Sequence, residues 1–399
     1  MPWPLIARVH GASALRRMVL EPRKSAVNRN LPALAEDGPA LSGGYNRREV
    51  WGGLVRVGEY RSTTINDVAE AAGVSIRTVS RVLNKSPKVG AASRERIEAV
   101  IRELRFSPSS RARALASGRS SLIGVVQDDP NAHVIGVLQR GIVDVCAALG
   151  YELVVHPARF ADPDLIRDVE AFIARSRIDG LIVLPPVSEV SQIPLALAHM
   201  GVPAIGIAAV RVPGYAGALI SEERTAAALL ADHLVTLGHR RIAIITGPRS
   251  FYSASEREQG FRGALAAHGI ELPERYVVEG DYGFATGHAR AAALLDLPEP
   301  PTAIFASNDI TAAAAIKAAH ERGIAVPDRL SVAGFDDSDI ASMISPALTT
   351  IRRPLLAMAH EATERLIGMI GDPEVRRLPD HRVSLSMIER QSTGPAPRP

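Results

Sequence analysis

The chain of 399 residues has a single cysteine, Cys146, and only 4% of its residues are aromatic. One thiol cannot close an intramolecular disulfide, and this usage is typical of a reducing compartment. No apolar run approaches the ~18 residues that a membrane-spanning helix needs. The first residues, MPWPLIARVHGASALRRMVL, lack the charged-then-apolar order of a secretory signal. These absences predict a cytoplasmic protein with a buried structural thiol and no membrane partner.

The motifs that mark common catalytic sites are also missing. The sequence contains no P-loop, no HExxH and no GxSxG. Its 11 histidines do not have the spacing of metal ligands. Carboxylates at strand ends leave a metal site or glycoside chemistry as a remote alternative. We expect a protein that is not an enzyme and that uses no metal or cofactor.

Positive charge is scarce in most of the chain and concentrated near its start. Residues 61–119 carry 12 Lys/Arg against 5 Asp/Glu, whereas residues 120–399 carry 25 against 33. A basic module joined to an acidic body indicates a polyanionic partner for that module alone. A merely solvated basic surface is the alternative, and charge does not decide between the two.

Composition and periodicity divide the chain into five parts. The first sixty residues mix Pro, Gly, Ser and charges without a sustained period, as disordered segments do. A start of translation at Met18 or later is a rival explanation for this stretch. The predicted parts are a disordered extension (1–60), a three-helix head (61–106), a basic linker (107–120), a two-lobed body (121–392) and a frayed tail (393–399).

The stretch TINDVAEAAGVSIRTVSRVLNKS, residues 64–86, predicts two short helices joined by a tight turn. Apolar residues recur at helical spacing on both sides of Gly73, and Ser75 is placed to cap the second helix. Such a pair is a helix-turn-helix, whose second helix enters the major groove of DNA. Val79 and Val82 face inward, which leaves arginines on the outer side. An ordinary helical hairpin with exposed arginines is the alternative.

The outward-facing side chains of this second helix suit contacts with double-stranded DNA. Arginine pairs with two acceptors of guanine, and an aliphatic side chain packs against a thymine methyl. Ile76, Arg77 and Arg81 are therefore the expected base readers. Hydroxyls near the helix starts suit phosphates, which position the protein without specifying sequence. The expected phosphate contacts are Thr64, Ser75, Thr78 and Ser80.

From residue 121 onward, apolar runs of strand length alternate with helical stretches. The predicted strands are SLIGVV, YELVVH, DGLIVL, PAIGIA, GALIS, RIAIIT, TAIFAS and LSVAGF. Near-continuous apolar strands separated by helices are typical of parallel sheets covered on both faces. The series is too long for one compact sheet and divides near residue 220. The predicted fold class is α/β, with an all-α head followed by two doubly wound parallel-sheet subdomains.

The helix-turn-helix stretch closely resembles the head of the LacI/GalR family of bacterial transcription regulators. The resemblance covers residues 63–392, where LGHRRIAIITGP, SASEREQGFRGAL, IFASNDITA, LSVAGFDD and PALTTIRRP match family landmarks in order. It implies a homodimer on operator DNA and a body like that of periplasmic binding proteins. SPSSRARALA stands at the place of the family's hinge helix, which implies that Leu115 wedges into the minor groove. An apolar wedge between base steps kinks the duplex.

Polar residues at strand ends predict the effector site. In open α/β sheets, ligands lie beyond the carboxyl ends of the strands, and Asp, Asn and Arg supply the donors and acceptors that sugar hydroxyls need. The resemblance implies effector contacts for Asp128, Arg257, Asn308 and Asp336. Ala208 stands where many relatives have an acidic residue, which leaves the identity of any sugar open. Two neighbouring acids, Asp309 and Asp337, are as well suited to capping a helix or forming a turn as to contacting the effector.

Together these features predict a sequence-specific DNA-binding regulator that represses genes of sugar uptake or catabolism. A small effector bound between the two lobes would control it. A regulator of the same fold that responds to a purine or another metabolite is the alternative. A solute-binding protein shares the body and is a remote alternative, because it has no use for the head.

Overall fold

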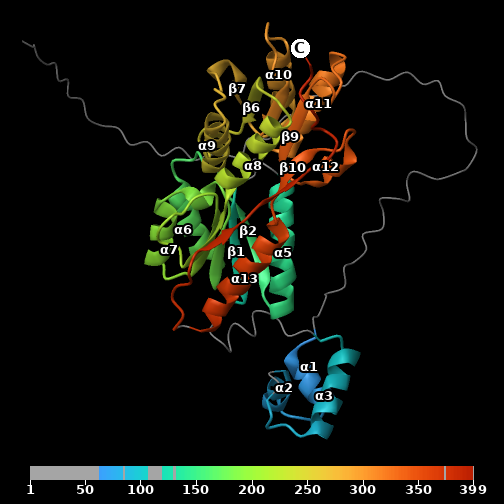
Figure 1. Ribbon diagram of the computed structural model, residues 1–399. Helices are drawn as coiled ribbons and strands as arrows, with labels where there is room; N and C mark the ends of the chain where they lie inside the picture. The colour runs from blue at the N-terminus through green and yellow to red at the C-terminus, as the bar shows by residue number, and fades with distance from the viewer. Residues whose placement is uncertain (1–62, 84–85, 107–118, 129–131, 373, 399) are drawn as a thin grey trace, which may run out of the picture. The chain divides into compact units, whose positions relative to one another are not determined.

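The computed structural model describes residues 63–83, 86–106, 119–128, 132–372 and 374–398. These residues form a three-helix head and a body of two α/β lobes (Figure 1). The predicted N-terminal extension and residues 107–118 of the predicted hinge, with Leu115, lie outside the described residues.

The head packs three short helices around an apolar centre. They are α1 (Ile65–Ala71), α2 (Ile76–Leu83) and α3 (Ala91–Glu103). Gly73 joins α1 to α2 with φ of 62°, a left-handed conformation that an L side chain rarely adopts. The buried side chains of the head are Val68, Ala69, Ala72, Val79, Val82 and Ile97. The inward positions of Val79 and Val82 agree with the prediction from the sequence.

The first lobe contains a six-stranded, fully parallel sheet in the order β11-β5-β4-β3-β1-β2. Its strands are β1 (Leu122–Gln127), β2 (Glu152–Pro157), β3 (Gly180–Val183), β4 (Ala204–Ala208), β5 (Gly217–Ser221) and β11 (His381–Val383). One face packs against α5 (Ala132–Leu149) and α13 (Leu355–Gly371). The other face packs against α6 (Leu165–Ser176), the short η1 (Val187–Glu189) and α7 (Gln192–His199).

The second lobe repeats this architecture with the order β12-β10-β9-β8-β6-β7, in which only β12 is antiparallel to its neighbour. Its strands are β6 (Ile242–Thr246), β7 (Val277–Glu279), β8 (Ala303–Ala306), β9 (Ser331–Asp336), β10 (Thr349–Arg352) and β12 (Ser386–Ile388). Its helices are α8 (Glu223–Thr236), α9 (Tyr252–Ala267), η2 (Glu274–Tyr276), α10 (Phe284–Leu295), α11 (Asp309–Glu321) and α12 (Asp339–Met343). The α/β fold class is thus confirmed.

The chain passes between the lobes three times, not once. The predicted division near residue 220 is the first passage, from β5 into α8. The chain returns after β10 to form α13 and β11, and then crosses again to β12 (Figure 1). Glu222 ties the first passage to the third, because its backbone N–H donates to the Val383 carbonyl at 3.0 Å and its carboxylate accepts from Ser384 Oγ at 2.9 Å.

The C-terminal segment is bonded to the second lobe where we expected a frayed tail. His239 is fully buried and lies in the loop after α8. Its Nε2 is 3.0 Å from the Gly394 carbonyl, and its Nδ1 is 2.9 Å from Thr302 Oγ1. Thr393 Oγ1 lies 2.9 Å from Thr349 Oγ1, and the Ala396 N–H donates to the Leu237 carbonyl at 2.8 Å. The ending TGPAPRP suggested fraying, but backbone and hydroxyl hydrogen bonds hold this segment as far as Ala396.

Two glycines of α9 give a paired test of how tightly α8 and α9 pack. A Cβ at Gly260 would collide with the backbone carbonyl of Arg224, whereas a Cβ at Gly263 would meet no atom within 4 Å. We expect Gly260→Ala to lower the free energy of unfolding by about 1–3 kcal/mol through overpacking. Gly263→Ala should raise it by about 0.5–1 kcal/mol, because alanine favours the helix. Urea unfolding curves measure both, and equal shifts in one direction would contradict this packing.

Candidate DNA interface and candidate effector site

The start of α2 is built by side-chain capping. Ser75 Oγ accepts from the Thr78 N–H at 3.3 Å and lies 2.9 Å from Thr78 Oγ1. At α1, the Thr64 hydroxyl accepts from the Asp67 N–H, and the Asp67 carboxylate accepts from the Thr64 N–H at 2.7 Å. Three of the predicted phosphate contacts therefore also fix the two helix starts. Capping of this kind sets the angle at which α2 leaves the turn.

The outer side of α2 carries the predicted base readers. Ile76 is 50% exposed, Arg77 is exposed and Arg81 is half-buried. In the described part of the head, no ion pair holds either guanidinium. Ser80 is half-buried on the same helix. An exposed aliphatic side chain beside two arginines on one helix is the chemistry that reads base edges in a major groove.

A cavity lies between the two lobes, at the carboxyl ends of their parallel strands. It contains about 540 Å³ of free space, part of which is open solvent at its mouth. The wall from the first lobe is apolar, and the wall from the second lobe is aromatic and charged. The lining residues are Val134, Ile135, Pro185, Pro186, Ala209, Glu223, Phe251, Ser253, Arg257, Tyr282, Asp336 and Arg353.

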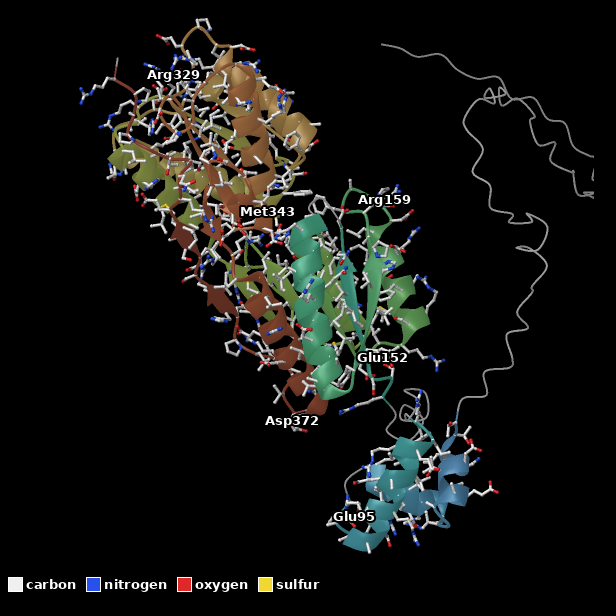
Figure 2. All side chains as sticks on the ribbon, turned by 90° about the vertical axis from the view of Figure 1, so that its right-hand side faces the viewer. Glu95, Glu152, Arg159, Arg329, Met343 and Asp372 are labelled. Atoms are coloured by element: carbon white, nitrogen blue, oxygen red, sulfur yellow. The ribbon has the colours of Figure 1, made fainter. Side chains whose placement is uncertain are left out.

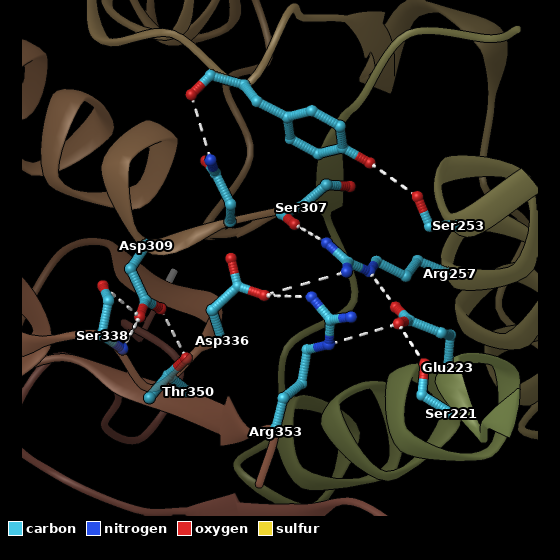
Figure 3. A network of polar contacts seen from close by, with 12 residues as sticks. Ser221, Glu223, Ser253, Arg257, Ser307, Asp309, Asp336, Ser338, Thr350 and Arg353 are labelled. Carbon is cyan, nitrogen blue, oxygen red and sulfur yellow. Dashed lines mark hydrogen bonds and ion pairs between the residues drawn. The ribbon is translucent and has the colours of Figure 1, made fainter. Parts of the chain in front are cut away.

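Four charged side chains meet in this cavity (Figure 3). Arg257 Nε donates to Glu223 Oε2 at 2.5 Å, and Arg353 Nη1 donates to Asp336 Oδ1 at 3.1 Å. Arg353 Nε also lies 3.4 Å from Glu223 Oε1. Arg257 Nη1 donates to the Ser307 carbonyl, which fixes the guanidinium from its other side. The four residues are at most 9% exposed, so the ion pairs are shielded from water.

Glu223, Arg257, Asp336 and Arg353 form a charged quartet, in which the ion pairs shift the pKa values of Glu223 and Arg257. Burial alone would raise the pKa of Glu223, but Arg257 and Arg353 outweigh it and hold that pKa below its usual range. Burial opposes the charge of Arg257, yet Glu223 raises the pKa of the guanidinium. Arg257 also stacks 3.8 Å from the centroid of the Phe335 ring. Two cations balance two anions, so the quartet offers donors and acceptors without a net charge.

The structure places two of the four predicted effector residues in the cavity. Arg257 and Asp336 line it, whereas Asn308 and Asp128 are absent from its lining. Asn308 is buried and caps α11, because its Oδ1 accepts from the Thr311 N–H at 2.9 Å. Asp128 accepts from the Phe160 N–H at 2.8 Å, which anchors the loop after β2. Asn308 and Asp128 thus have structural roles in the fold, and their contacts with an effector stay a prediction.

Sequence reasoning missed the two charged residues at the passages between the lobes. Glu223 begins α8 after the first passage, and Arg353 follows β10 at the second. The aromatic residues Phe251 and Tyr282 were also missed. Phe251 lies in the loop directly before α9. The signal for Arg353 was present in PALTTIRRP, which we had used only as a landmark.

Asp309 holds the second lobe together. Its carboxylate accepts from the Ser338 N–H at 2.7 Å, from Ser338 Oγ at 2.9 Å and from Thr350 Oγ1 at 2.5 Å. The residue is 1% exposed and does not line the cavity. Of the two possibilities left open from the sequence, the structure places Asp309 as a structural acceptor. Asp337 likewise pairs with Arg352 and Arg390, both at 2.6 Å.

Burial, with a further contribution from Asp336, raises the pKa of Asp309 to about 7, whereas an unfolded aspartate titrates near ~3.9. Between these values the folded chain holds a proton that the unfolded chain has lost. Ionisation therefore lowers the free energy of unfolding as pH rises through this window. We expect Asp309→Asn, which cannot ionise, to gain about 2 kcal/mol on the unmodified chain between pH 5 and pH 8. Urea unfolding at both pH values measures this gain, and a pH-independent difference would contradict it.

Three further features bear on the function of the chain, namely possible metal ligands, possible membrane-spanning helices and the thiol. No group of three or more His, Cys, Asp or Glu within the described ranges is arranged to hold a metal ion. Likewise, none of the described helices is long and apolar enough to cross a bilayer. Cys146 is buried in the first lobe, and burial raises the pKa of its thiol to about 11, as expected of a structural cysteine.

Two family models match the chain. Residues 64–109 match the model described as bacterial regulatory proteins, lacI family. Residues 231–393 match the model of a periplasmic binding protein-like domain. The matched ranges contain the helix-turn-helix and most of the second lobe, respectively.

Curated relatives and solved structures agree with these matches. The chain is 34% identical to the HTH-type transcriptional regulator DegA of Bacillus subtilis (strain 168), over 75% of this chain and 89% of that protein. It is 32% identical to the ribose operon repressor of Escherichia coli (strain K12), over 79% and 95%. The lac repressor dimer bound to operator and the anti-inducer ONPF superposes with a TM-score of 0.73, at 29% identity and covering 84% and 100%. The chain therefore belongs to the LacI family of bacterial regulatory proteins.

Proposed function

We propose that this chain is a homodimeric repressor of genes for sugar uptake or catabolism, released or engaged by a sugar bound between its lobes. The observation that carries the proposal is that one chain combines a DNA-binding type of head with a cavity-containing body. The head presents an arginine-bearing helix, and the body has a cavity between two lobes that is lined by buried, charge-balanced ion pairs. A regulator of operator DNA acts in the cytoplasm, which accords with the single buried thiol.

DNA recognition is assigned to the outer side of α2. Ile76, Arg77 and Arg81 would meet base edges, because an exposed guanidinium can bond two guanine acceptors at once. The helix starts, with Thr64, Ser75, Thr78 and Ser80, would follow the phosphates. Leu115, in the predicted hinge, would enter the central minor groove and kink it. The affinity for DNA would fall as the salt concentration rises, because the basic head, and not the acidic body, contacts the phosphates.

The chemistry of the cavity supports a sugar as effector. Its paired acids and arginines supply acceptors and donors for hydroxyls, and its apolar wall suits the C–H face of a sugar ring. Among the similar structures are a complex of the regulator CelR with cellobiose (28% identity, TM-score 0.62) and a LacI family regulator from Enterococcus faecium with bound ribose (26%, 0.61). The ribose operon repressor is a curated relative.

A purine is the second candidate effector. The HTH-type transcriptional repressor PurR of Klebsiella pneumoniae (strain 342) is 31% identical over 343 residues. Phe251 and Tyr282 would offer rings against which a base could stack. The balance of two cations and two anions favours hydroxyls over a planar base, so a sugar remains the first choice.

Exposed apolar side chains support a homodimer. Val143 on α5 and Leu356 on α13 are 46% and 41% exposed, and these two helices pack side by side. Met343, labelled in Figure 2, is 76% exposed at the end of α12, and Phe284 is 47% exposed at the start of α10. Apolar residues on both lobes suit a second copy of the chain, and a two-fold dimer matches a palindromic operator.

The effector would act by changing how the lobes sit on each other. Glu223 and Arg353 line the cavity, and both lie where the chain passes between the lobes. Glu223 comes directly after the first passage, and Arg353 lies at the start of the second. A sugar that binds one lobe arrangement more tightly would shift the population that presents the heads to DNA. The five predicted ranges, 1–60, 61–106, 107–120, 121–392 and 393–399, remain our proposal for the domains, except that residues 393–396 belong with the second lobe.

Selection of binding sites from a random pool of duplex DNA tests this function. The purified full chain should enrich a two-fold symmetric sequence, and sugars should change the amount of DNA retained. Enrichment without symmetry would contradict the dimer. Retention that no sugar and no purine changes would contradict effector control.

A further inference from the structure

A second hollow adjoins the cavity between the lobes. It contains about 880 Å³ of free space, open to solvent, and its lining includes Phe160 and Gln192 of the first lobe and Tyr252 and Ser255 of the second. Phe251 lines both hollows, so its ring stands at the boundary between the inner cavity and this outer groove. Phe160 and Phe251 meet edge to face across the lobes, with ring centroids 5.5 Å apart.

Glu189 lies at the same boundary and has an unused acceptor. It is 5% exposed at the end of η1, and its Oε1 accepts from the Ala209 N–H at 2.7 Å. Among the described residues, none bonds to the other oxygen, Oε2. Ala209 lines the inner cavity and Glu189 lines the outer groove. Buried polar atoms nearly always have a partner, so this orphan oxygen indicates that a ligand supplies one.

Building on the proposed sugar response, we propose that the effector is a disaccharide or glycoside that spans both hollows. Its first ring would occupy the inner cavity against the charged quartet. Its second unit would lie in the outer groove beside Phe251, and a hydroxyl near the junction would donate to Glu189 Oε2. Ser255 and Gln192 would supply further hydroxyl and amide contacts to the second unit.

The charges of the outer groove favour a neutral second unit over a phosphate. Arg249, the arginine of its lining, lies 3.5 Å from Glu279 Oε2, and the Arg249 N–H donates to Glu279 Oε1 at 3.0 Å. This cation is therefore already compensated. Burial raises the pKa of Glu189 to about 7, so the groove does not present a fixed anion that would demand a cationic ligand. The hydroxyls of a neutral sugar unit can form hydrogen bonds with both Arg249 and Glu189.

Isothermal titration of the full chain tests the proposal with matched pairs of sugars. The probes are cellobiose, maltose, lactose, sucrose and trehalose, each beside its constituent monosaccharides and their methyl glycosides. We expect at least one disaccharide to bind about tenfold or more tightly than its monosaccharides. Equal affinities within every pair would overturn the two-unit effector while leaving a sugar-responsive regulator intact. Failure of every sugar to bind would instead overturn the proposed sugar response itself.

Two variants locate the second unit in the outer groove. Ser255→Trp, on α9, should fill the groove and erase the advantage of the disaccharide over the monosaccharide. Glu189→Gln, which keeps one acceptor for the Ala209 N–H, should weaken the disaccharide about tenfold. Ala266→Trp, an exposed change on α9 outside both hollows, serves as the control for added bulk. An undiminished disaccharide advantage in both folded variants would overturn the placement.

Discussion

Replacing Arg257 with methionine is expected to lower the free energy of unfolding by about 3–5 kcal/mol and to abolish the response of operator binding to sugar. The guanidinium is 3% exposed and bonds Glu223 and the Ser307 carbonyl. Removing it leaves the buried carboxylate of Glu223 with the more distant Arg353, at 3.4 Å, and the neutral hydroxyl of Ser221, at 2.7 Å. The stability loss is measured by urea unfolding, and the response by fluorescence anisotropy of labelled operator.

A double variant separates the two consequences of this change. Glu223→Gln added to Arg257→Met removes the uncompensated charge and leaves the Arg353–Asp336 pair at 3.1 Å intact. We expect the double variant to recover at least half of the lost stability, because the penalty comes from an unpaired buried ion. The sugar response should stay lost, since two lining groups are gone. A single variant with wild-type stability and a normal response would refute this account of the cavity.

Replacing Arg77 or Arg81 with alanine is expected to cost about 1–3 kcal/mol of discrimination between operator and random DNA. The reason is geometric, because Val79 and Val82 fix the inner side of α2 and leave these arginines outside. Affinity for random duplex should change far less than affinity for operator. Competition titrations at one salt concentration measure the two affinities.

Arg96→Ala is the matched control for these arginine variants. Arg96 is an exposed arginine on α3 of the same head, so its loss removes one charge without touching α2. Arg96→Ala should weaken binding to operator and binding to random duplex to a similar degree. If the α2 variants lost both affinities in the same proportion as Arg96→Ala, the base-reading role would be wrong.

Most of the fold could be predicted from local patterns in the sequence. The turn at Gly73, the cap at Ser75 and the inward valines of α2 all follow from residues a few positions apart, and the structure confirms them. The eight predicted strands correspond to β1 to β6, β8 and β9, because each is an unbroken apolar run. The strands that were missed, β7, β10, β11 and β12, have only three or four residues. Each of these four also contains polar residues, whereas the predicted four-residue strands β3 and β8 are wholly apolar, so the missed strands have too little hydrophobicity to stand out.

The site was less predictable, because its residues meet only through the tertiary fold. Glu223 and Arg353 are 130 positions apart, and the packing of α8 beside β10 in the second lobe brings them together. A polar residue after a strand can face the cavity or cap the next helix, as Asp336 and Asn308 respectively do. Periodicity does not distinguish these two outcomes. Ala208, where we noted a missing acid, is not among the residues that line the cavity, and Glu189, which accepts from the neighbouring Ala209 N–H, could be found only from the structure.

The central claim is that one chain couples a sequence-reading head to a sugar-binding body. Anisotropy titration of a selected operator against random duplex at moderate salt, with and without the tightest-binding sugar, tests it most directly. The account predicts a preference for the operator of about 10³ or more, which the sugar changes by about fivefold or more. Equal affinity for operator and random duplex, both with and without sugar, would contradict it.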